Sequence, residues 1–185
     1  DRDADAAAQF EKASEIWTRA LGADHPNVAT ALYHLGQVEL KQGHPSDAAA
    51  SFQRALDIWQ KRLGPDHPSL AAALAGLGDA ALARTHAAEA LADYQRALAV
   101  LEKTFGPDHA ALVDPLVSIG TAELALHDPR HAVPPLERAV ALATKAGDPV
   151  DLAGAQFALA RALGGSDPAR ARTLATAAQQ AFAAA

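Results

Sequence analysis

A repeat of fixed length constrains this chain more than any other feature of its sequence. Three stretches of similar sequence begin at Leu21, Leu63 and Phe105, so the pattern repeats every 42 residues. Each stretch opens with a loop that contains Gly and Asp-His, and small and apolar residues follow at matching positions. A period in this range, filled with helix-forming residues, is typical of helical solenoids, in which each unit packs mainly against its neighbours. The sequence therefore predicts an all-α fold with an elongated core.

Each full repeat predicts two helices joined by a short turn. In the repeat that begins at Leu63, the first helix follows a loop that contains Gly64 and Asp66-His67-Pro68. Glycine is suited to end the preceding helix, and proline is suited to the first helical turn. Histidine recurs in this loop as His25, His67 and His109, and this periodicity predicts that it caps or shapes each loop rather than binding a metal.

The repeat boundaries predict a single array over residues 1–185. Residues 5–20 match the second helix of an incomplete repeat, because Phe10 and Trp17 align with Phe52 and Trp59 one period later. Full repeats are predicted at residues 21–62, 63–104 and 105–146, and a divergent last repeat at 147–185. Since the opening helix lacks its partner helix, we expect an upstream domain or further repeats to precede it.

Composition and motifs argue against several classes of function. The net charge is −6, and Lys and Arg are spread along the chain, so nucleic acid is not the expected partner. Charged or polar residues interrupt every apolar stretch, which predicts no membrane span. The chain has no cysteine, which excludes disulfides and thiolate metal sites and favours a cytoplasmic location.

No catalytic or cofactor motif stands out, so we expect no enzyme activity, no cofactor and no metal site. His127 and His131 have a spacing that suits zinc on a continuous helix. A helix is predicted to begin between them, at Asp128-Pro129, which argues against a shared ion.

Small and aromatic residues at fixed positions of the repeat resemble the tetratricopeptide repeat (TPR) family. The resemblance implies a right-handed α-solenoid of helix-turn-helix hairpins with about nine helices, in which small residues allow close approach and an aromatic ring fills the space between neighbouring hairpins. The 42-residue period and the Leu-Gly-x-Asp-His-Pro loop are similar to the kinesin light chain subtype, and the composition resembles that of bacterial examples. The matching positions are Leu35-Gly36, Leu77-Gly78 and Ile119-Gly120, then Ala48, Ala90 and Ala132, then Phe52, Tyr94 and Leu136.

In the TPR family, the first helix of each hairpin lines a concave groove that holds peptides or partner helices. The resemblance therefore implies a partner-binding groove here, with apolar contacts from Tyr33 and Phe157 and hydrogen bonds from other exposed residues. Carried over by motif register, the groove positions are Thr30, Tyr33, Gln37, Lys41, Ala75, Asp79, Ala83, Asp114, Val117, Thr121, Phe157 and Arg161. The alternative is that these are ordinary solvated surface residues.

The resemblance implies a protein-protein interaction scaffold that binds a peptide or helix of a partner protein. A second interpretation is an intramolecular regulatory or structural spacer attached to a signalling kinase, ATPase or protease domain outside these residues. The sequence does not specify the ligand or the oligomeric state.

Overall fold

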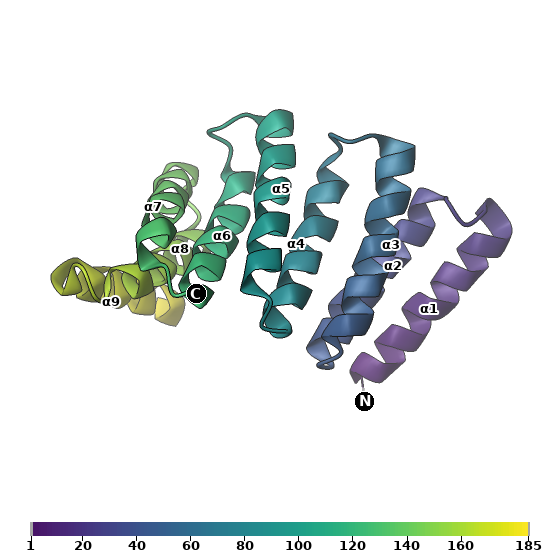
Figure 1. Cartoon of the computed structure of the whole chain (residues 1–185), viewed down its shortest axis with the longest axis horizontal. Helices are drawn as coiled ribbons and strands as arrows, with labels where there is room; N and C mark the ends of the chain where they lie inside the picture. Colours follow the sequence, from purple (N-terminus) through teal and green to yellow (C-terminus); the bar gives the residue numbers. More distant parts are fainter. Residues whose placement is uncertain (1, 185) are drawn as a thin grey trace. The chain divides into compact units, whose positions relative to one another are not determined.

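The structure is a computed structural model that describes residues 2–184, with side chains for residues 5–183. These residues form nine α-helices and one short 3₁₀ helix, η1, and contain no β-strand. Short turns connect the helices into hairpins (Figure 1), so the predicted all-α fold of helical hairpins is confirmed. The helices are α1 (Arg2–Leu21), α2 (Pro26–Lys41), α3 (Pro45–Leu63), α4 (Pro68–Ala83), α5 (Ala87–Phe105), η1 (Ala110–Leu112), α6 (Val113–Ala125), α7 (Pro129–Ala146), α8 (Pro149–Leu163) and α9 (Pro168–Ala184).

The helices group into two compact units, Asp1–Val100 and Leu101–Ala185, and the boundary falls within α5. In the first unit α1 contacts α2, α2 contacts α3 and α3 contacts α4, and in the second unit α6 contacts α7, α7 contacts α8 and α8 contacts α9. Contacts between consecutive helices are the pattern expected of a solenoid. The single array over residues 1–185 stays a prediction, and Asp1 and Ala185 lie outside the described residues.

Histidine caps α2 and α4, the first helices of two full repeats, and the 3₁₀ helix η1 that precedes α6 in the third. The Nδ1 atoms of His25 and His67 accept hydrogen bonds of 3.2 Å from the backbone N–H groups two residues later, and His109 accepts one of 3.1 Å. Each bond satisfies one of the N–H groups that have no partner within the helix. The predicted capping role of these residues is confirmed.

Phe52 shows how neighbouring hairpins fit together in the first unit. Its side chain on α3 is only 1% exposed. A Cβ atom added at Gly36 of α2 would lie 2.9 Å from the Phe52 ring, and one added at Gly76 of α4 would lie 2.7 Å from it. The ring therefore lies between two first helices that can approach only because these positions lack a side chain, which confirms the predicted use of small and aromatic residues.

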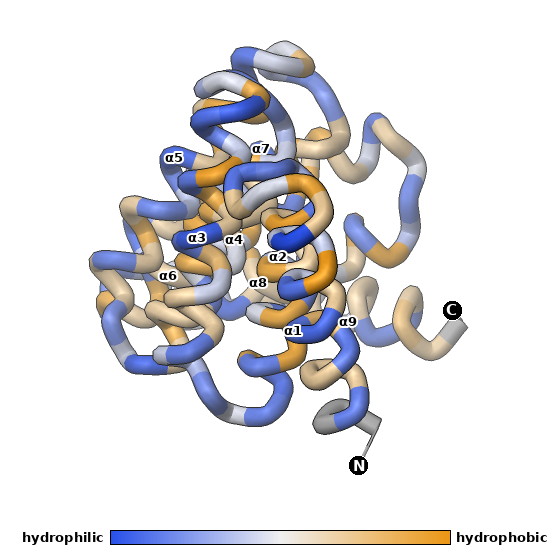
Figure 2. Tube along the Cα trace, turned by 90° about the vertical axis from the view of Figure 1, so that its right-hand side faces the viewer, coloured by the Kyte–Doolittle hydropathy of each residue, from blue (hydrophilic) through white to orange (hydrophobic). Residues whose placement is uncertain are grey.

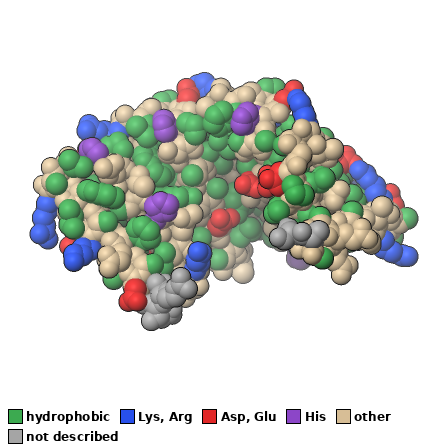
Figure 3. Space-filling view, turned by 180° about the vertical axis from the view of Figure 1, so that it is seen from behind, with side chains coloured by type: hydrophobic (Ala, Val, Ile, Leu, Met, Phe, Trp, Pro, Cys, Tyr) green, Lys and Arg blue, Asp and Glu red, His purple; other side chains and the backbone are tan. Residues whose placement is uncertain are grey.

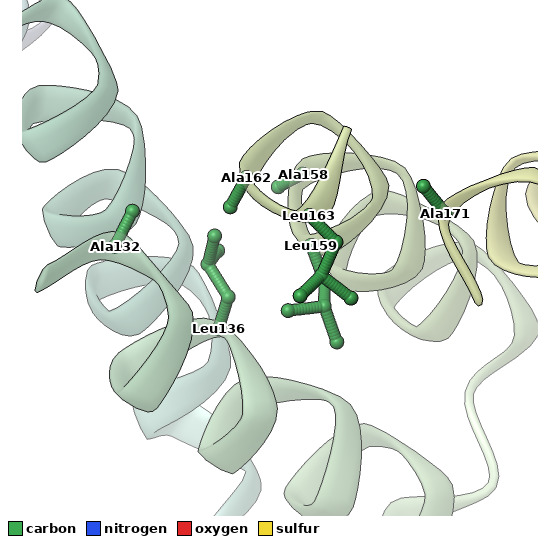
Figure 4. Packing of buried hydrophobic residues seen from close by; sticks show 7 residues of the cluster. All are labelled: Ala132, Leu136, Ala158, Leu159, Ala162, Leu163 and Ala171. Carbon is green, nitrogen blue, oxygen red and sulfur yellow. The ribbon is translucent and has the colours of Figure 1, made fainter. Parts of the chain in front are cut away.

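The second unit has an aliphatic core in place of the aromatic ring. Figure 4 shows Leu136 of α7 pointing toward Ala162 of α8, in one cluster with Leu159 and Leu163 of the same helix. Ala171 extends this cluster onto α9. Smaller side chains thus fill the seam between hairpins where the sequence of the repeat diverges.

Hydrophobic and hydrophilic residues are interspersed along the chain in Figure 2, as expected when one side of most helices is buried. None of the helices within residues 2–184 is both long enough and apolar enough to cross a bilayer.

Thr85 occupies a backbone conformation that suits glycine. It lies in the α4–α5 turn with φ of 63°, and Gly43 occupies the equivalent turn one repeat earlier with φ of 79°. Left-handed backbone is unfavourable for an L-residue, above all a β-branched one.

We therefore expect Thr85→Gly to raise the free energy of unfolding by about 0.5–1 kcal/mol, after allowance for the flexibility of glycine in the unfolded chain. Urea unfolding measures the change. Thr18→Gly, within the helical backbone of α1, is the matched control and should lower stability. A loss of stability in Thr85→Gly would contradict the assignment of strain to this turn.

Candidate functional site

The predicted groove residues of α2 lie along one side of that helix. Thr30, Gln37 and Lys41 are exposed, and Tyr33 is half-buried. Their spacing of three or four residues places them on one helical face. The Thr30 hydroxyl donates a hydrogen bond of 3.2 Å to the Pro26 carbonyl of its own helix, so its proton is already used within the chain.

A hydrogen-bonded network orients Gln37. Its Nε2 donates to the Tyr33 hydroxyl oxygen at 3.0 Å, and its Oε1 lies 3.0 Å from Nδ1 of His34. The side-chain amide is therefore held by two neighbours, while the residue as a whole remains exposed. An ordered, exposed amide is suited to hydrogen bonding with the backbone of an extended peptide.

Aromatic rings pack against the Tyr33 and His34 side chains of this network. The Tyr33 ring lies 5.7 Å from the Phe52 ring and 5.8 Å from the Trp59 ring, between centroids. The His34 ring stacks on Phe10 of α1 at 5.3 Å. The sequence-based set omits His34 and Phe10, although the three-residue spacing of His34 and Gln37 on one helix could have indicated the first.

Asp79 projects from α4 and is anchored by the next helix. The Tyr94 hydroxyl on α5 donates a hydrogen bond of 2.6 Å to Asp79 Oδ1, and the Tyr94 ring is buried. Ala75 and Ala83, the other predicted positions on α4, contribute only methyl groups. Sequence reasoning assigned Tyr94 to packing alone and missed this positioning role, which Phe52 and Leu136 at equivalent positions cannot perform because they lack a hydroxyl.

The pKa values of Asp79 and Tyr33 are both raised by their surroundings. Although the residue is exposed, its carboxyl group loses part of its hydration, which raises its pKa above the ordinary value of 3.8, while the Tyr94 hydrogen bond acts in the opposite direction. Burial, with a smaller contribution from the Asp79 charge, raises the pKa of Tyr33. The charge of Asp79 on α4 therefore acts on the predicted groove residue Tyr33 of α2.

Asp79→Asn should change the pH dependence of stability. Because the pKa of Asp79 is raised in the folded state, the folded protein binds this proton more tightly, and its stability falls as pH rises from 3.8 through the folded pKa. Asparagine does not titrate, so the variant lacks this loss of stability. Its side-chain oxygen can still accept the hydrogen bond from the Tyr94 hydroxyl. Urea unfolding at about pH 4 and about pH 7 should show the variant gaining stability relative to the natural chain at the higher pH. An equal difference at both pH values would contradict the assignment.

The α6 positions in the second unit are less uniform. Asp114 is exposed at the start of the helix. Loss of hydration raises the pKa of Asp151 on α8, and the charges of Asp148 and Asp114 add to this effect. Thr121 donates its hydroxyl to the Val117 carbonyl at 2.9 Å. Val117 itself is partly buried and packs against the aliphatic core of this unit, so it offers less surface than an exposed groove position would.

Phe157 and Arg161 are both exposed on α8 and lie one helical turn apart. Phe157 is 51% exposed, an unusual degree for an aromatic side chain. The two residues border a shallow pocket against α9, completed by Ala160, Ala171, Arg172 and Ala175. The second unit thus offers an apolar side chain next to a cation.

Acidic, basic and hydrophobic side chains are interspersed on the face shown in Figure 3. Among the described residues, no group of three or more His, Asp or Glu side chains is placed to hold a metal ion. His131 instead pairs with Asp128, the N-cap of α7, at 2.7 Å. The helix therefore begins between His127 and His131, as predicted.

Comparison with protein families identifies the repeat. The tetratricopeptide repeat model matches residues 1–61, 47–92 and 86–145. No curated protein matches the chain in sequence.

Solved structures share the fold. The kinesin light chain nearly identical TPR-like repeats of Podosopora anserina superimpose with a TM-score of 0.79 at 23% identity, over 98% of this chain and 87% of theirs. BtubC (BKLC) from P. vanneervenii gives a TM-score of 0.81 at 21% identity, over 95% of this chain and 74% of its own. MamA gives 0.65 at 20% identity, over 95% and 90%. At these identities the similarity establishes the fold alone, and it confirms the predicted TPR-type α-solenoid.

Proposed function

The chain belongs to the tetratricopeptide repeat family, and from this premise we propose that it binds a peptide or helix of a partner protein along its first helices. Proteins with the TPR fold generally act as scaffolds that bind other proteins. The proposed binding faces are the exposed sides of α2 and α4 in the first unit and of α6 and α8 in the second. We also propose that the chain has no catalytic activity of its own and acts in the cytoplasm.

The observation that carries this proposal is the ordered polar network on α2 and α4. Tyr33, Gln37 and His34 are joined by hydrogen bonds, and Asp79 is held by Tyr94 from the neighbouring helix. Side chains fixed before binding lose little entropy when a partner arrives, which favours recognition.

The side chains on these faces are suited to a partner that carries both polar and apolar groups. Gln37 offers an amide, Asp79 a carboxylate and Phe157 an exposed aromatic ring. A peptide with polar backbone groups and a cationic side chain would match the face of the first unit, and an apolar side chain would match Phe157 of the second unit. The net charge of −6 favours such a peptide over nucleic acid.

Affinity capture from a lysate of the source organism tests the proposal. The bait pair is the natural chain and a Gln37→Ala, Phe157→Ala double variant, because these side chains are exposed whereas Tyr33 also packs against Phe52 and Trp59. We expect a protein that is captured by the natural chain and lost from the variant, with unchanged melting temperatures. Equal capture by both baits would argue against these faces and would favour the intramolecular spacer.

A further inference from the structure

A second recognition site lies in the second unit, where the α6–α7 turn meets the end of α8. The pocket is lined by residues of α6, α7 and α8 and of the α8–α9 turn. Its apolar lining includes Leu124, Val133 and Leu163. Leu163 belongs to the aliphatic core shown in Figure 4, and the other two side chains pack against that core. The floor of the pocket is therefore an open edge of a packed core.

Cations line the same pocket. Arg130 at the start of α7 and Arg161 on α8 contribute guanidinium groups, and His127 and Ser166 from the two turns add further polar groups. Both arginines are exposed. Neither forms an ion pair with another residue of the described chain, whereas Arg170 nearby pairs with Glu137 at 2.7 Å.

The neighbouring carboxylates are already engaged. Asp128 pairs with His131 at 2.7 Å and caps the backbone of α7. Asp167 accepts a hydrogen bond of 3.0 Å from the backbone N–H of Arg170. In a chain of net charge −6, this pocket therefore presents two arginines that form no ion pair with the nearby Asp128 and Asp167.

Arginine binds carboxylates through paired N–H groups, and the apolar floor favours an aliphatic side chain next to the carboxylate. We propose that this pocket binds an acidic peptide segment of a partner protein, in which Asp or Glu side chains flank an apolar residue. This inference rests on the proposed function, since it names one class of partner. The pocket shares Arg161 with the sequence-based groove set and adds Arg130, which lies outside that set.

Fluorescence polarisation with defined peptides tests this site directly. The probe is a labelled peptide, Glu-Leu-Glu-Leu-Glu, blocked at both ends so that only side-chain carboxylates are present. Its controls replace every Glu by Gln, or every Leu by Ser. We expect the natural chain to bind the probe and to bind both controls at least about tenfold more weakly, with the affinity for the probe falling as salt is added.

Two single substitutions locate the binding. Arg130→Gln should weaken binding of the probe by about tenfold, because a charge-assisted pair is lost. Arg54→Gln, the same change on an exposed residue of α3 in the first unit, should leave binding within about twofold. Unchanged binding in Arg130→Gln, absence of binding by the natural chain, or binding only of a peptide with a free C-terminus would overturn the proposal.

The Gln37→Ala, Phe157→Ala variant separates this inference from the proposed function. This double variant should bind the labelled peptide as tightly as the natural chain does, since neither Gln37 nor Phe157 lines this pocket. If partner capture is insensitive to that variant while the probe still depends on Arg130, the first-helix faces are excluded and the pocket stands. If the labelled peptide does not bind and partner capture still depends on Gln37 and Phe157, the pocket is excluded as a binding site and binding at the first-helix faces is supported.

Discussion

Replacing Phe52 by alanine is expected to lower the free energy of unfolding of the first unit by about 3–5 kcal/mol. The side chain is 1% exposed and lies between Gly36 of α2 and Gly76 of α4, with the Tyr33 ring at 5.7 Å. Its removal leaves a cavity at the seam between two hairpins. Neighbouring backbone can close such a cavity only in part, so the loss includes cavity and transfer contributions.

Phe52→Leu is the matched control, because leucine fills the equivalent position at Leu136. We expect it to lose less than half as much stability as Phe52→Ala, since most of the volume is kept. Both tryptophans of the chain, Trp17 and Trp59, lie in the first unit, so urea unfolding followed by tryptophan fluorescence reports on that unit. A loss below about 1 kcal/mol in the alanine variant would show that the ring does not join the hairpins.

Adding one methyl group at Gly78 is expected to lower the free energy of unfolding by about 1–3 kcal/mol. A Cβ atom at this position would lie 2.5 Å from the Tyr94 ring, which is too close for any real contact. The ring cannot simply move away, because its hydroxyl is bonded to Asp79 on the same helix as Gly78. The variant must therefore shift α5 away from α4 or displace the ring.

Gly154→Ala makes the same chemical change where there is space. No heavy atom lies within 4 Å of a Cβ placed at this position of α8. Alanine is the better helix former, so this variant should gain about 0.5–1 kcal/mol. Unfolding of both variants followed by circular dichroism should give changes of opposite sign, and a gain in both would contradict the close approach at Gly78.

The helices and their packing could be predicted because each repeat depends mainly on its neighbours. His25, His67 and His109 share one loop position and one capping role, so periodicity alone identified them. Gly36 and Gly78 could be assigned to close approach because the aromatic partner recurs in the next helix. Such regularities follow from local geometry that is copied with the sequence.

The details of the candidate site depend on side chains that meet across helices. The bond between Tyr94 and Asp79 joins residues fifteen positions apart and exists in one repeat only, so no period reveals it. Val117 matched the register of an exposed position but packs against an aliphatic core in the divergent part of the chain. The pocket at Arg130 depends on two turns that follow different helices, and register along the first helices could not place it.

Site-specific photo-crosslinking tests the central claim, that the first-helix faces bind a protein partner. A photoreactive amino acid replaces Gln37 on α2 in one variant and Gln53, an exposed residue of α3 outside the proposed faces, in the other. After irradiation in the source lysate, we expect a discrete protein adduct from position 37 and none from position 53. Adducts of equal yield from both positions, or from position 53 alone, would contradict binding at these faces.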